Sequence, residues 1–156
     1  MDGRNTERSG GLDITVTTVA SDSHTWNLVY LQLLLEELGH RVSNLGPCVP
    51  GNLLVDECRT RRPDLIVISS VNGHGHQDGA RVIAALRACP ALAGTPVVIG
   101  GKLGITGQRD AAGRARDLLA RGFDAVFEGP GAEDAFRAHL AALAPLAGCG
   151  LPGAPR

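Results

Sequence analysis

The middle of the chain carries an unbroken apolar run, Leu65-Ile66-Val67-Ile68. A strand with one solvent-exposed face alternates apolar and polar residues, so a continuous apolar run indicates a strand buried on both faces. Such strands occur at the centre of parallel sheets that helices cover on both sides. The run therefore predicts a central strand, for which the rest of the chain must supply neighbours and covering helices.

Similar apolar runs alternate with amphipathic stretches along the rest of the chain. The five predicted strands are Leu12–Ala20, Arg41–Leu45, Leu65–Ile68, Pro96–Ile99 and Ala125–Phe127. The five predicted helices are Trp26–Leu38, Leu53–Arg61, Asp78–Ala88, Arg109–Arg121 and Ala132–Leu143. This alternation is typical of an α/β fold with a doubly wound parallel sheet. With right-handed crossovers and the strand order 2-1-3-4-5, the fold is flavodoxin-like.

One domain accounts for the 156 residues, because this length is enough to bury one hydrophobic core. We expect the domain to cover residues 12–144. The two ends, residues 1–11 and 145–156, are rich in glycine, proline and charge, and we expect them to be disordered tails. The polar start lacks the apolar centre of a secretory signal, so we expect a cytoplasmic protein.

The composition narrows the range of partners. A net charge of −1 favours neither nucleic acid nor an anionic membrane as a partner. No apolar run approaches the roughly 18 to 20 residues that span a bilayer. The scattered cysteines form no Cys-x-x-Cys pair, which favours free thiols over a disulfide or a zinc site. They are Cys48, Cys58, Cys89 and Cys149.

The predicted fold also indicates where a ligand would bind. In open α/β sheets, ligands lie outside the carboxyl ends of the strands, where the chain order reverses. Three segments of unusual composition follow the first, third and fourth strands: Ser21–Thr25, Ser69–His76 and Gly100–Gly104. We expect these segments to meet at one edge of the sheet.

The first segment, Ser21-Asp22-Ser23-His24-Thr25, contains a histidine two residues after an aspartate. A neutral imidazole can bind a metal through one nitrogen while the other donates to a carboxylate, which sets the tautomer and the ring orientation. The same residues also suit a helix cap beside a solvated histidine. The loop alone leaves both interpretations open.

The second segment, Ser69–His76, follows the central strand with small hydroxyl residues and glycines. Ser69 and Ser70 can hydrogen-bond a ligand held against the sheet, and glycine lets the backbone approach it closely. His74 and His76 are expected in a loop, where such a pair either binds a metal or simply contacts solvent. The third segment, Gly100-Gly101-Lys102-Leu103-Gly104, opens with a double glycine, which indicates a tight turn or a flat ligand packed against backbone.

Together the segments resemble the base-off, His-on cobalamin-binding domain family. The resemblance rests on Asp22-Ser23-His24, Ser69-Ser70-Val71 and Gly100-Gly101, and extends from about Leu12 to about Leu143. Within this family the phrases Ser69-Ser70-x-x-Gly73-x-Gly75 and Gly122-Phe123-Asp124-x-Val126-Phe127 are similar to the small subunit of glutamate mutase (methylaspartate mutase).

The resemblance implies a bound adenosylcobalamin whose dimethylbenzimidazole leaves the cobalt, with the nucleotide tail buried in the domain. His24 would be the axial cobalt ligand, Asp22 would accept the other imidazole N–H, and Ser69 and Val71 would line the tail pocket. The cofactor-binding residues that it implies are Ser21, Asp22, Ser23, His24, Thr25, Ser69, Ser70, Val71, Gly73, Gly100, Gly101, Lys102, Leu103 and Gly104.

The resemblance also implies a reaction and a partner. The cofactor supplies radical chemistry for a carbon-skeleton rearrangement, L-glutamate to threo-3-methylaspartate. A separate, large barrel subunit would hold the substrate in a heterotetramer-like assembly, so this chain alone is expected to be an inactive subunit of an isomerase. The family loop continues as Asp-x-His-x-x-Gly, whereas this chain has Trp26-Asn27 at the last two positions. Asn tolerates positive φ better than other non-glycine residues, so the loop backbone is expected to survive.

Other flavodoxin-like proteins fit the sequence less well. A phospho-receiver needs an aspartate after the third strand and a lysine after the fifth, where this chain has Ser69-Ser70 and Glu128. A flavodoxin needs aromatic residues to stack on its flavin, and aromatics make up only 3 % of the chain. A cobalamin carrier for methyl transfer usually adds an N-terminal helical cap, which the eleven polar residues before the first strand do not supply. A non-catalytic cobalamin sensor or storage protein remains a further alternative.

Overall fold

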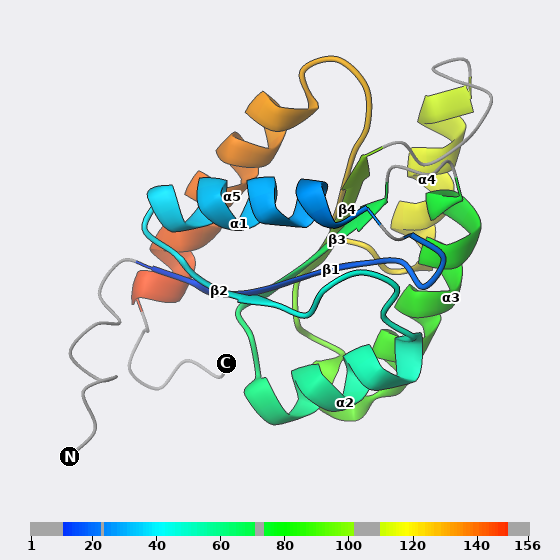
Figure 1. Ribbon diagram of the computed structural model, residues 1–156, viewed down its shortest axis with the longest axis horizontal. Coiled ribbons are helices and arrows are strands. Elements are labelled where there is room, and N and C mark those ends of the chain that lie inside the picture. Colours follow the sequence, from blue (N-terminus) through cyan, green and yellow to red (C-terminus); the bar gives the residue numbers. More distant parts are fainter. Residues whose placement is uncertain (1–10, 23, 71–73, 102–109, 150–156) are drawn as a thin grey trace.

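The computed structural model describes residues 11–22, 24–70, 74–101 and 110–149. They form a five-stranded parallel sheet in the order β2-β1-β3-β4-β5 (Figure 1). The strands are β1 (Asp13–Thr18), β2 (Arg41–Asn44), β3 (Leu65–Ser70), β4 (Val97–Gly101) and β5 (Ala125–Phe127). The predicted flavodoxin-like α/β fold and its strand order are confirmed.

Five α-helices connect and follow the strands, and a 3-10 turn, Pro90–Leu92, precedes β4. The helices are α1 (Thr25–Glu37), α2 (Gly51–Arg61), α3 (Gly75–Ala88), α4 (Ala111–Arg121) and α5 (Ala132–Cys149). Helices α1 and α5 cover one face of the sheet, and α2, α3 and α4 cover the other (Figure 1). Among the described helices, none is long and apolar enough to cross a membrane.

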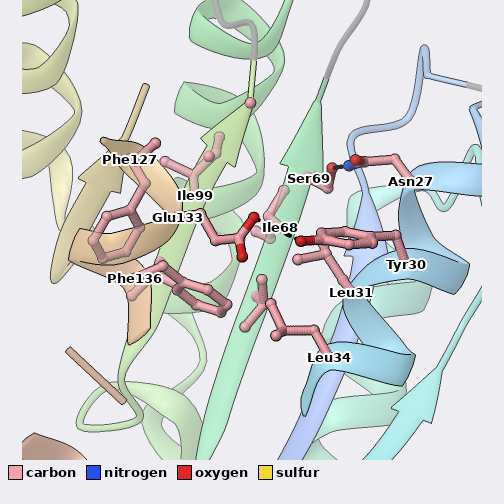
Figure 2. Close-up of a pocket in the computed structure, with 15 residues that line it drawn as sticks. Asn27, Tyr30, Leu31, Leu34, Ile68, Ser69, Ile99, Phe127, Glu133 and Phe136 are labelled. Atoms are coloured by element: carbon pink, nitrogen blue, oxygen red, sulfur yellow. Dashed lines mark hydrogen bonds between the residues drawn. The ribbon is translucent and has the colours of Figure 1, made fainter. Parts of the chain in front are cut away.

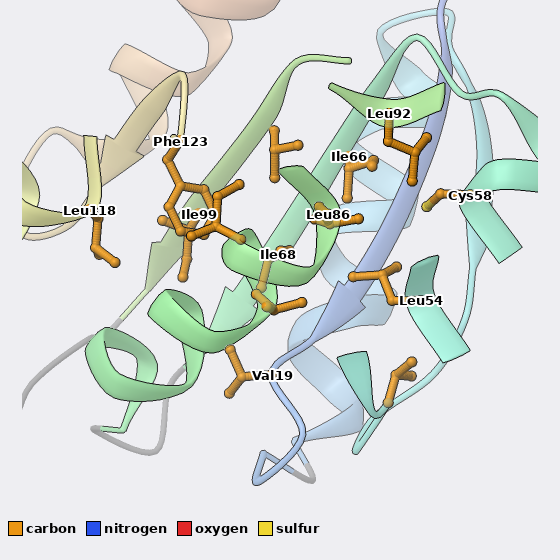
Figure 3. Packing of buried hydrophobic residues seen from close by; sticks show 14 residues of the cluster. Val19, Leu54, Cys58, Ile66, Ile68, Leu86, Leu92, Ile99, Leu118 and Phe123 are labelled. Carbon is orange, nitrogen blue, oxygen red and sulfur yellow. The ribbon is translucent and has the colours of Figure 1, made fainter. Parts of the chain in front are cut away.

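The central strand β3 separates two hydrophobic cores, which explains its unbroken apolar sequence. Ile66 and Ile68 pack into the core beneath α2, α3 and α4 (Figure 3). Val67 points to the opposite face and packs with Val16 and Val98 beneath α1 and α5. All six residues of β3 are buried, so each face of the strand needs apolar side chains.

Several element ends differ from the prediction. Helix α3 begins at Gly75 instead of Asp78, so His76 lies in a helix and the predicted loop at this position is wrong. Strand β4 includes Gly100 and Gly101, because they pair with Ser69 and Ser70 in the sheet. Helix α5 runs past Leu143 to Cys149, where several alanines and leucines favour the helix despite one proline. The backbone of residues 145–149 is therefore helical in the structure, and the disordered tails at the two ends stay a prediction.

Candidate functional site

The carboxyl edge of the sheet brings the candidate residues into one row. Thr18 of β1 is paired with Ser69 of β3, Ser69 with Gly100 of β4, and Gly100 with Phe127 of β5. The loop with Asp22 leaves β1 just beyond this row. Parallel strands end at the same edge, so segments far apart in sequence meet here as predicted.

His24 and Asp22 form a close side-chain pair at this edge. The Nδ1 atom of His24 lies 2.6 Å from Oδ1 of Asp22. The same carboxylate oxygen accepts the backbone N–H of His24 at 2.9 Å. An ionised carboxylate can only accept, so Nδ1 carries the proton and a neutral ring keeps its Nε2 lone pair for a metal. The His24 side chain is 56 % exposed and that of Asp22 only 1 %, so a ligand can reach the imidazole while its partner stays fixed.

Buried groups hold the backbone of Asp22. Its carbonyl oxygen accepts the Thr18 hydroxyl at 2.9 Å and the Cys48 N–H at 2.9 Å. The Cys48 N–H also donates to the Thr18 hydroxyl oxygen, at 2.9 Å. The Asp22 N–H closes a turn to the carbonyl of Val19 at 3.0 Å. The loop that orients His24 is therefore tied to the end of β1 and to the segment after β2.

A cavity of about 140 Å³ lies over the same end of the sheet, between α1 and α5 (Figure 2). Its floor is formed by β3, β4 and β5, and its walls by the two helices. Its lining residues are Asn27, Tyr30, Leu31, Leu34, Val67, Ile68, Ser69, Val98, Ile99, Gly100, Gly101, Phe127, Ala132, Glu133 and Phe136. An apolar cavity of about 150 Å³ is known to hold a benzene molecule, so this space suits an aromatic ring.

Two polar contacts cross the cavity (Figure 2). The Tyr30 hydroxyl on α1 donates to Oε1 of Glu133 on α5 at 2.6 Å, which bridges the two helices. The Asn27 amide Nδ2 donates to the Ser69 hydroxyl, which joins α1 to β3. The bond to the Glu133 carboxylate raises the pKa of Tyr30 above its ordinary value. The same bond, helped by Arg137, lowers the pKa of Glu133.

Gly100 and Gly101, at the end of β4, occupy positions where a side chain would clash with neighbouring backbone. A Cβ on Gly100 would lie 2.9 Å from the carbonyl oxygen of Phe127. A Cβ on Gly101 would lie 2.1 Å from the carbonyl oxygen of Ser70, and its φ of +116° is closed to side chains in any case. The double glycine is therefore required by backbone packing in the sheet, and it also leaves the cavity floor bare at this end.

The remaining predicted site residues do not all lie at the cavity. Ser21 is exposed and its hydroxyl contacts the Asp78 carboxylate of α3, away from the cavity. Thr25 is exposed and begins α1, while Ser70 is buried at the end of β3. The other six lie outside the described residues: Ser23, Val71, Gly73, Lys102, Leu103 and Gly104.

Two sequence interpretations near His24 need correction. His24 itself occupies the N-cap position of α1, so Asp22 does not cap the helix in the usual way. The Asp22 carboxylate instead accepts from His24, both backbone and ring. Asn27 was noted as a residue that tolerates the positive φ of a loop glycine, but it lies within α1, and no such φ occurs there among the described residues. The side chain of Trp26 lies outside the described part.

Sequence reasoning missed the residues that the helices contribute to the cavity. Asn27, Tyr30, Leu31 and Leu34 of α1 are spaced by three and four residues, which places them on one helix face. On α5, Glu133 and Phe136 face them. This spacing could have identified a wall, but a polar residue on an apolar helix face does not by itself indicate a cavity.

His76 and Glu128, which also lie near this edge, belong to structural pairs. Nε2 of His76 lies 2.7 Å from Oδ2 of Asp117, and Arg121 contacts the same carboxylate at 2.8 Å. Glu128, after β5, forms a nearly buried ion pair with Arg114 of α4 at 2.9 Å. Within the described residues, no three His, Cys, Asp or Glu side chains gather where they could share a metal ion.

In this flavodoxin-like domain a carboxylate-oriented histidine and an apolar cavity lie at the strand ends, an arrangement that defines a class of small-ligand-binding α/β domain with a histidine suited to a metal. The B12 binding domain family matches residues 12–139 of this chain. The chain therefore belongs to the B12-binding domain family.

Comparison with individual proteins supports this assignment. The chain is 32 % identical to the glutamate mutase sigma subunit of Halobacterium salinarum over 114 residues, which are 73 % of this chain and 74 % of that protein. It is 37 % identical to the HTH-type transcriptional repressor CarA of Myxococcus xanthus over 83 residues, 53 % of this chain but 28 % of that one. A cobalamin-binding protein from Desulfitobacterium hafniense has a similar fold, with a TM-score of 0.65 and 22 % identity. The match covers 84 % of this chain and 58 % of the other.

The described residues fit a cobalamin bound with its lower base removed from cobalt. His24 offers a nitrogen to a metal, and the cavity offers an apolar space for the displaced aromatic base. A cofactor held with its base on the cobalt would need neither feature.

Proposed function

We propose that the chain is the cobalamin-binding small subunit of an adenosylcobalamin-dependent carbon-skeleton mutase of the glutamate mutase type. The observation that carries the proposal is the His24–Asp22 pair at 2.6 Å, next to the end of β1 and one helix turn before a cavity suited to an aromatic base. The similarity to the sigma subunit, spread over 74 % of that protein, supports the type of enzyme.

Each part of the site has a separate task in this proposal. His24 binds the cobalt through Nε2, and Asp22 keeps the proton on Nδ1 and so holds the ring in the ligating tautomer. The cavity between α1 and α5 keeps the displaced base away from the cobalt and from water. When bound, adenosylcobalamin supplies a weak cobalt–carbon bond whose homolysis starts a radical rearrangement.

The substrate is proposed to bind to a second, large barrel-type subunit. In this proposal the groups at the strand ends of this chain hold the cofactor, so the substrate site is assigned to the partner. The proposed reaction is the interconversion of L-glutamate and threo-3-methylaspartate, by similarity to the sigma subunit. Neither subunit alone would then catalyse it.

The axial ligand can be tested by electron paramagnetic resonance of the Co(II) form of cobalamin. A bound ¹⁴N ligand splits the signal into triplets, and protein labelled uniformly with ¹⁵N should change them to doublets. His24→Ala should lose this change. His76→Ala is the matched control, since His76 has a similar carboxylate contact at 2.7 Å outside the site. Triplets that persist in ¹⁵N protein would show that the cofactor keeps its own base, and the ligand assignment would be wrong.

The reaction can be tested by adding a large glutamate mutase subunit and adenosylcobalamin to the purified chain. We expect threo-3-methylaspartate to form from L-glutamate only when both subunits and the cofactor are present. If cobalamin binds through His24 but the chain supports no rearrangement with such a subunit, the mutase part of the proposal fails and the cofactor site stands.

A second candidate function is a cobalamin-dependent regulator. The 37 % identity with the repressor CarA over 83 residues favours it. A regulator would act by responding to the cofactor itself, so its oligomeric state should change on cofactor binding without any added subunit. Analytical ultracentrifugation with and without cobalamin distinguishes the two candidates, because the mutase subunit is expected to show no such change by itself.

A further inference from the structure

The loop that carries His24 is held from both faces of the sheet. It leads from β1 into α1, which covers one face, whereas α3 covers the other (Figure 1). The hydroxyl of Ser21 donates to Oδ2 of Asp78, in the first turn of α3. The segment that leads into α1 is therefore anchored to a helix on the opposite face of the sheet.

Asp78 is itself firmly placed. Its side chain is only 13 % exposed, and its Oδ1 accepts the Arg81 guanidinium at 3.2 Å. The next residue, Gly79, packs α3 so closely on the sheet that a Cβ there would lie 2.7 Å from Cδ1 of Ile99. Asp78 is thus a fixed acceptor, and its position decides where the Ser21 hydroxyl is held.

A second anchor holds the residue that follows Ser21. The Asp22 carbonyl oxygen accepts the Thr18 hydroxyl and the Cys48 N–H, each at 2.9 Å. The two anchors therefore hold the chain on either side of the Asp22 α-carbon. The Asp22 carboxylate in turn lies 2.6 Å from Nδ1 of His24, whose side chain is 56 % exposed. A ring that is more than half exposed takes its direction mainly from this contact, and so from the anchored loop.

We propose that Asp78 is a positioning residue for His24 and acts through the Ser21 hydroxyl. This inference rests on the proposed cofactor site. Asp78 keeps the loop in the orientation in which Asp22 presents the imidazole to the cobalt. Without this anchor the loop gains orientations in which the imidazole lies away from the metal, while the buried Thr18 anchor and the two cores remain.

The size of the effect follows from the strength of one hydrogen bond to a carboxylate, reduced by its exposure to water. Its loss should shift the equilibrium between His-ligated and His-free cobalt by roughly three- to tenfold. A strongly favoured ligand shows this shift as a weaker affinity for the cofactor, and a weakly favoured one as a larger His-free fraction. The stability of the fold should change little, because the bond is at the surface.

The test is a double-mutant cycle on the full ¹⁵N-labelled chain with cob(II)alamin. Ser21→Ala removes the donor and Asp78→Ala removes the acceptor. Paramagnetic resonance, after unbound cofactor is removed, gives the ratio of His-free to His-ligated cobalt. Calorimetric titration gives the affinity, and urea denaturation gives the stability. Each single variant should change the ratio or the affinity by roughly three- to tenfold, and the double variant should change it no further.

Two further variants identify the hydrogen bond as the cause. Asp78→Asn should recover most of the wild-type behaviour, because its amide oxygen still accepts the Ser21 hydroxyl. Arg81→Ala is the matched control on the same helix turn. It removes the other partner of Asp78, is 80 % exposed in the wild type, and should keep the wild-type ratio and affinity.

The outcomes separate this inference from the proposed function. Wild-type ratio and affinity in both single variants, with the ¹⁵N doublets from His24 intact, overturn the positioning role and leave the cofactor site standing. Losses that add in the double variant, or a similar loss in Arg81→Ala, overturn the route through Ser21. Triplets that persist in the ¹⁵N-labelled wild type contradict the proposed cofactor site itself, and this inference with it.

Discussion

Thr18 and Asp22 are joined by a hydrogen bond of 2.9 Å from the Thr18 hydroxyl to the Asp22 carbonyl oxygen. Thr18 is the last residue of β1 and is 2 % exposed. The bond fixes the backbone of the residue whose carboxylate orients His24. A buried threonine on the sheet thus positions an exposed imidazole six residues later.

Replacing Thr18 should disturb this loop more than the sheet. Thr18→Val keeps the shape but removes the hydroxyl that donates to the Asp22 carbonyl and shares the Cys48 N–H, at a cost of about 1 kcal/mol in the free energy of unfolding. Thr18→Ser keeps the hydroxyl and should recover most of the cost. Urea denaturation measures the stability of all three proteins. A larger loss in Thr18→Ser than in Thr18→Val would mean that the methyl group, and not the hydroxyl, is the important part.

Tyr30 offers a direct probe of the contact between α1 and α5, because it is the only tyrosine in the chain. The hydrogen bond to Glu133 raises the pKa of its phenol, so Glu133→Ala should lower that pKa toward the ordinary value. Asp134→Ala, on the next residue of α5, is the control and should change the titration little. Absorbance of the phenolate against pH gives the pKa, with circular dichroism at each pH to confirm that the protein remains folded.

His40 should make the protein less stable in mild acid. It is 8 % exposed, its Nδ1 accepts the Leu12 N–H at 3.0 Å, and burial lowers its pKa. The His40 imidazole of the unfolded chain therefore takes up a proton at a higher pH than that of the folded chain. The free energy of unfolding consequently rises with pH between the folded and the unfolded pKa of this group. The contribution is complete above a pH of about 6.5, the unfolded value, and is lost as the pH falls through the folded pKa.

The Asn variant of this residue isolates the effect. In His40→Asn the amide oxygen can replace Nδ1 as the acceptor but does not titrate in this range. Thermal unfolding of wild type and variant from pH 7.5 to 5 should show a steeper decline for the wild type. Parallel curves would assign the acid sensitivity to other groups.

Gly101 should not tolerate a side chain. Its positive φ and the 2.1 Å approach of the Ser70 carbonyl oxygen both oppose a Cβ, so Gly101→Ala should cost about 2 to 4 kcal/mol in stability. Gly94 is the matched control, since a Cβ there meets nothing within 4 Å and its φ is not in the positive region. Gly94→Ala should be close to neutral in the same denaturation experiment. A small effect at Gly101 would mean that the end of β4 rearranges easily.

Arg62 offers a stabilising change. It follows α2 with φ 54° and ψ 60°, a left-handed conformation that glycine adopts without strain. Arg62→Gly should raise the free energy of unfolding by about 1 kcal/mol. Arg59→Gly, within the same helix, should lower it by about the same amount. Opposite signs in the two variants would confirm that backbone conformation and not loss of charge is responsible.

Much of this architecture could be predicted because its signals are local. The run Leu65–Ile68 identifies a strand with two apolar faces, and its neighbours recur at the spacing of a βα unit. Those patterns fix the parallel order, and the order fixes which loops share an edge. The loop Asp22–His24 and Gly100-Gly101 were therefore identified before any contact was known.

The helical wall of the cavity depends on contacts that no local pattern contains. Tyr30 and Glu133 are 103 positions apart, and their contact exists only because α1 and α5 pack side by side on one face. Asn27 looked like a replacement for a loop glycine, yet the first turn of α1 carries it to Ser69 on β3. By itself, the sequence determined the order of the elements and the edge where chemistry occurs, since periodicity and turn residues act over a few positions. Only the tertiary structure decided the shape and polarity of the cavity, because these arise where side chains from separate elements converge.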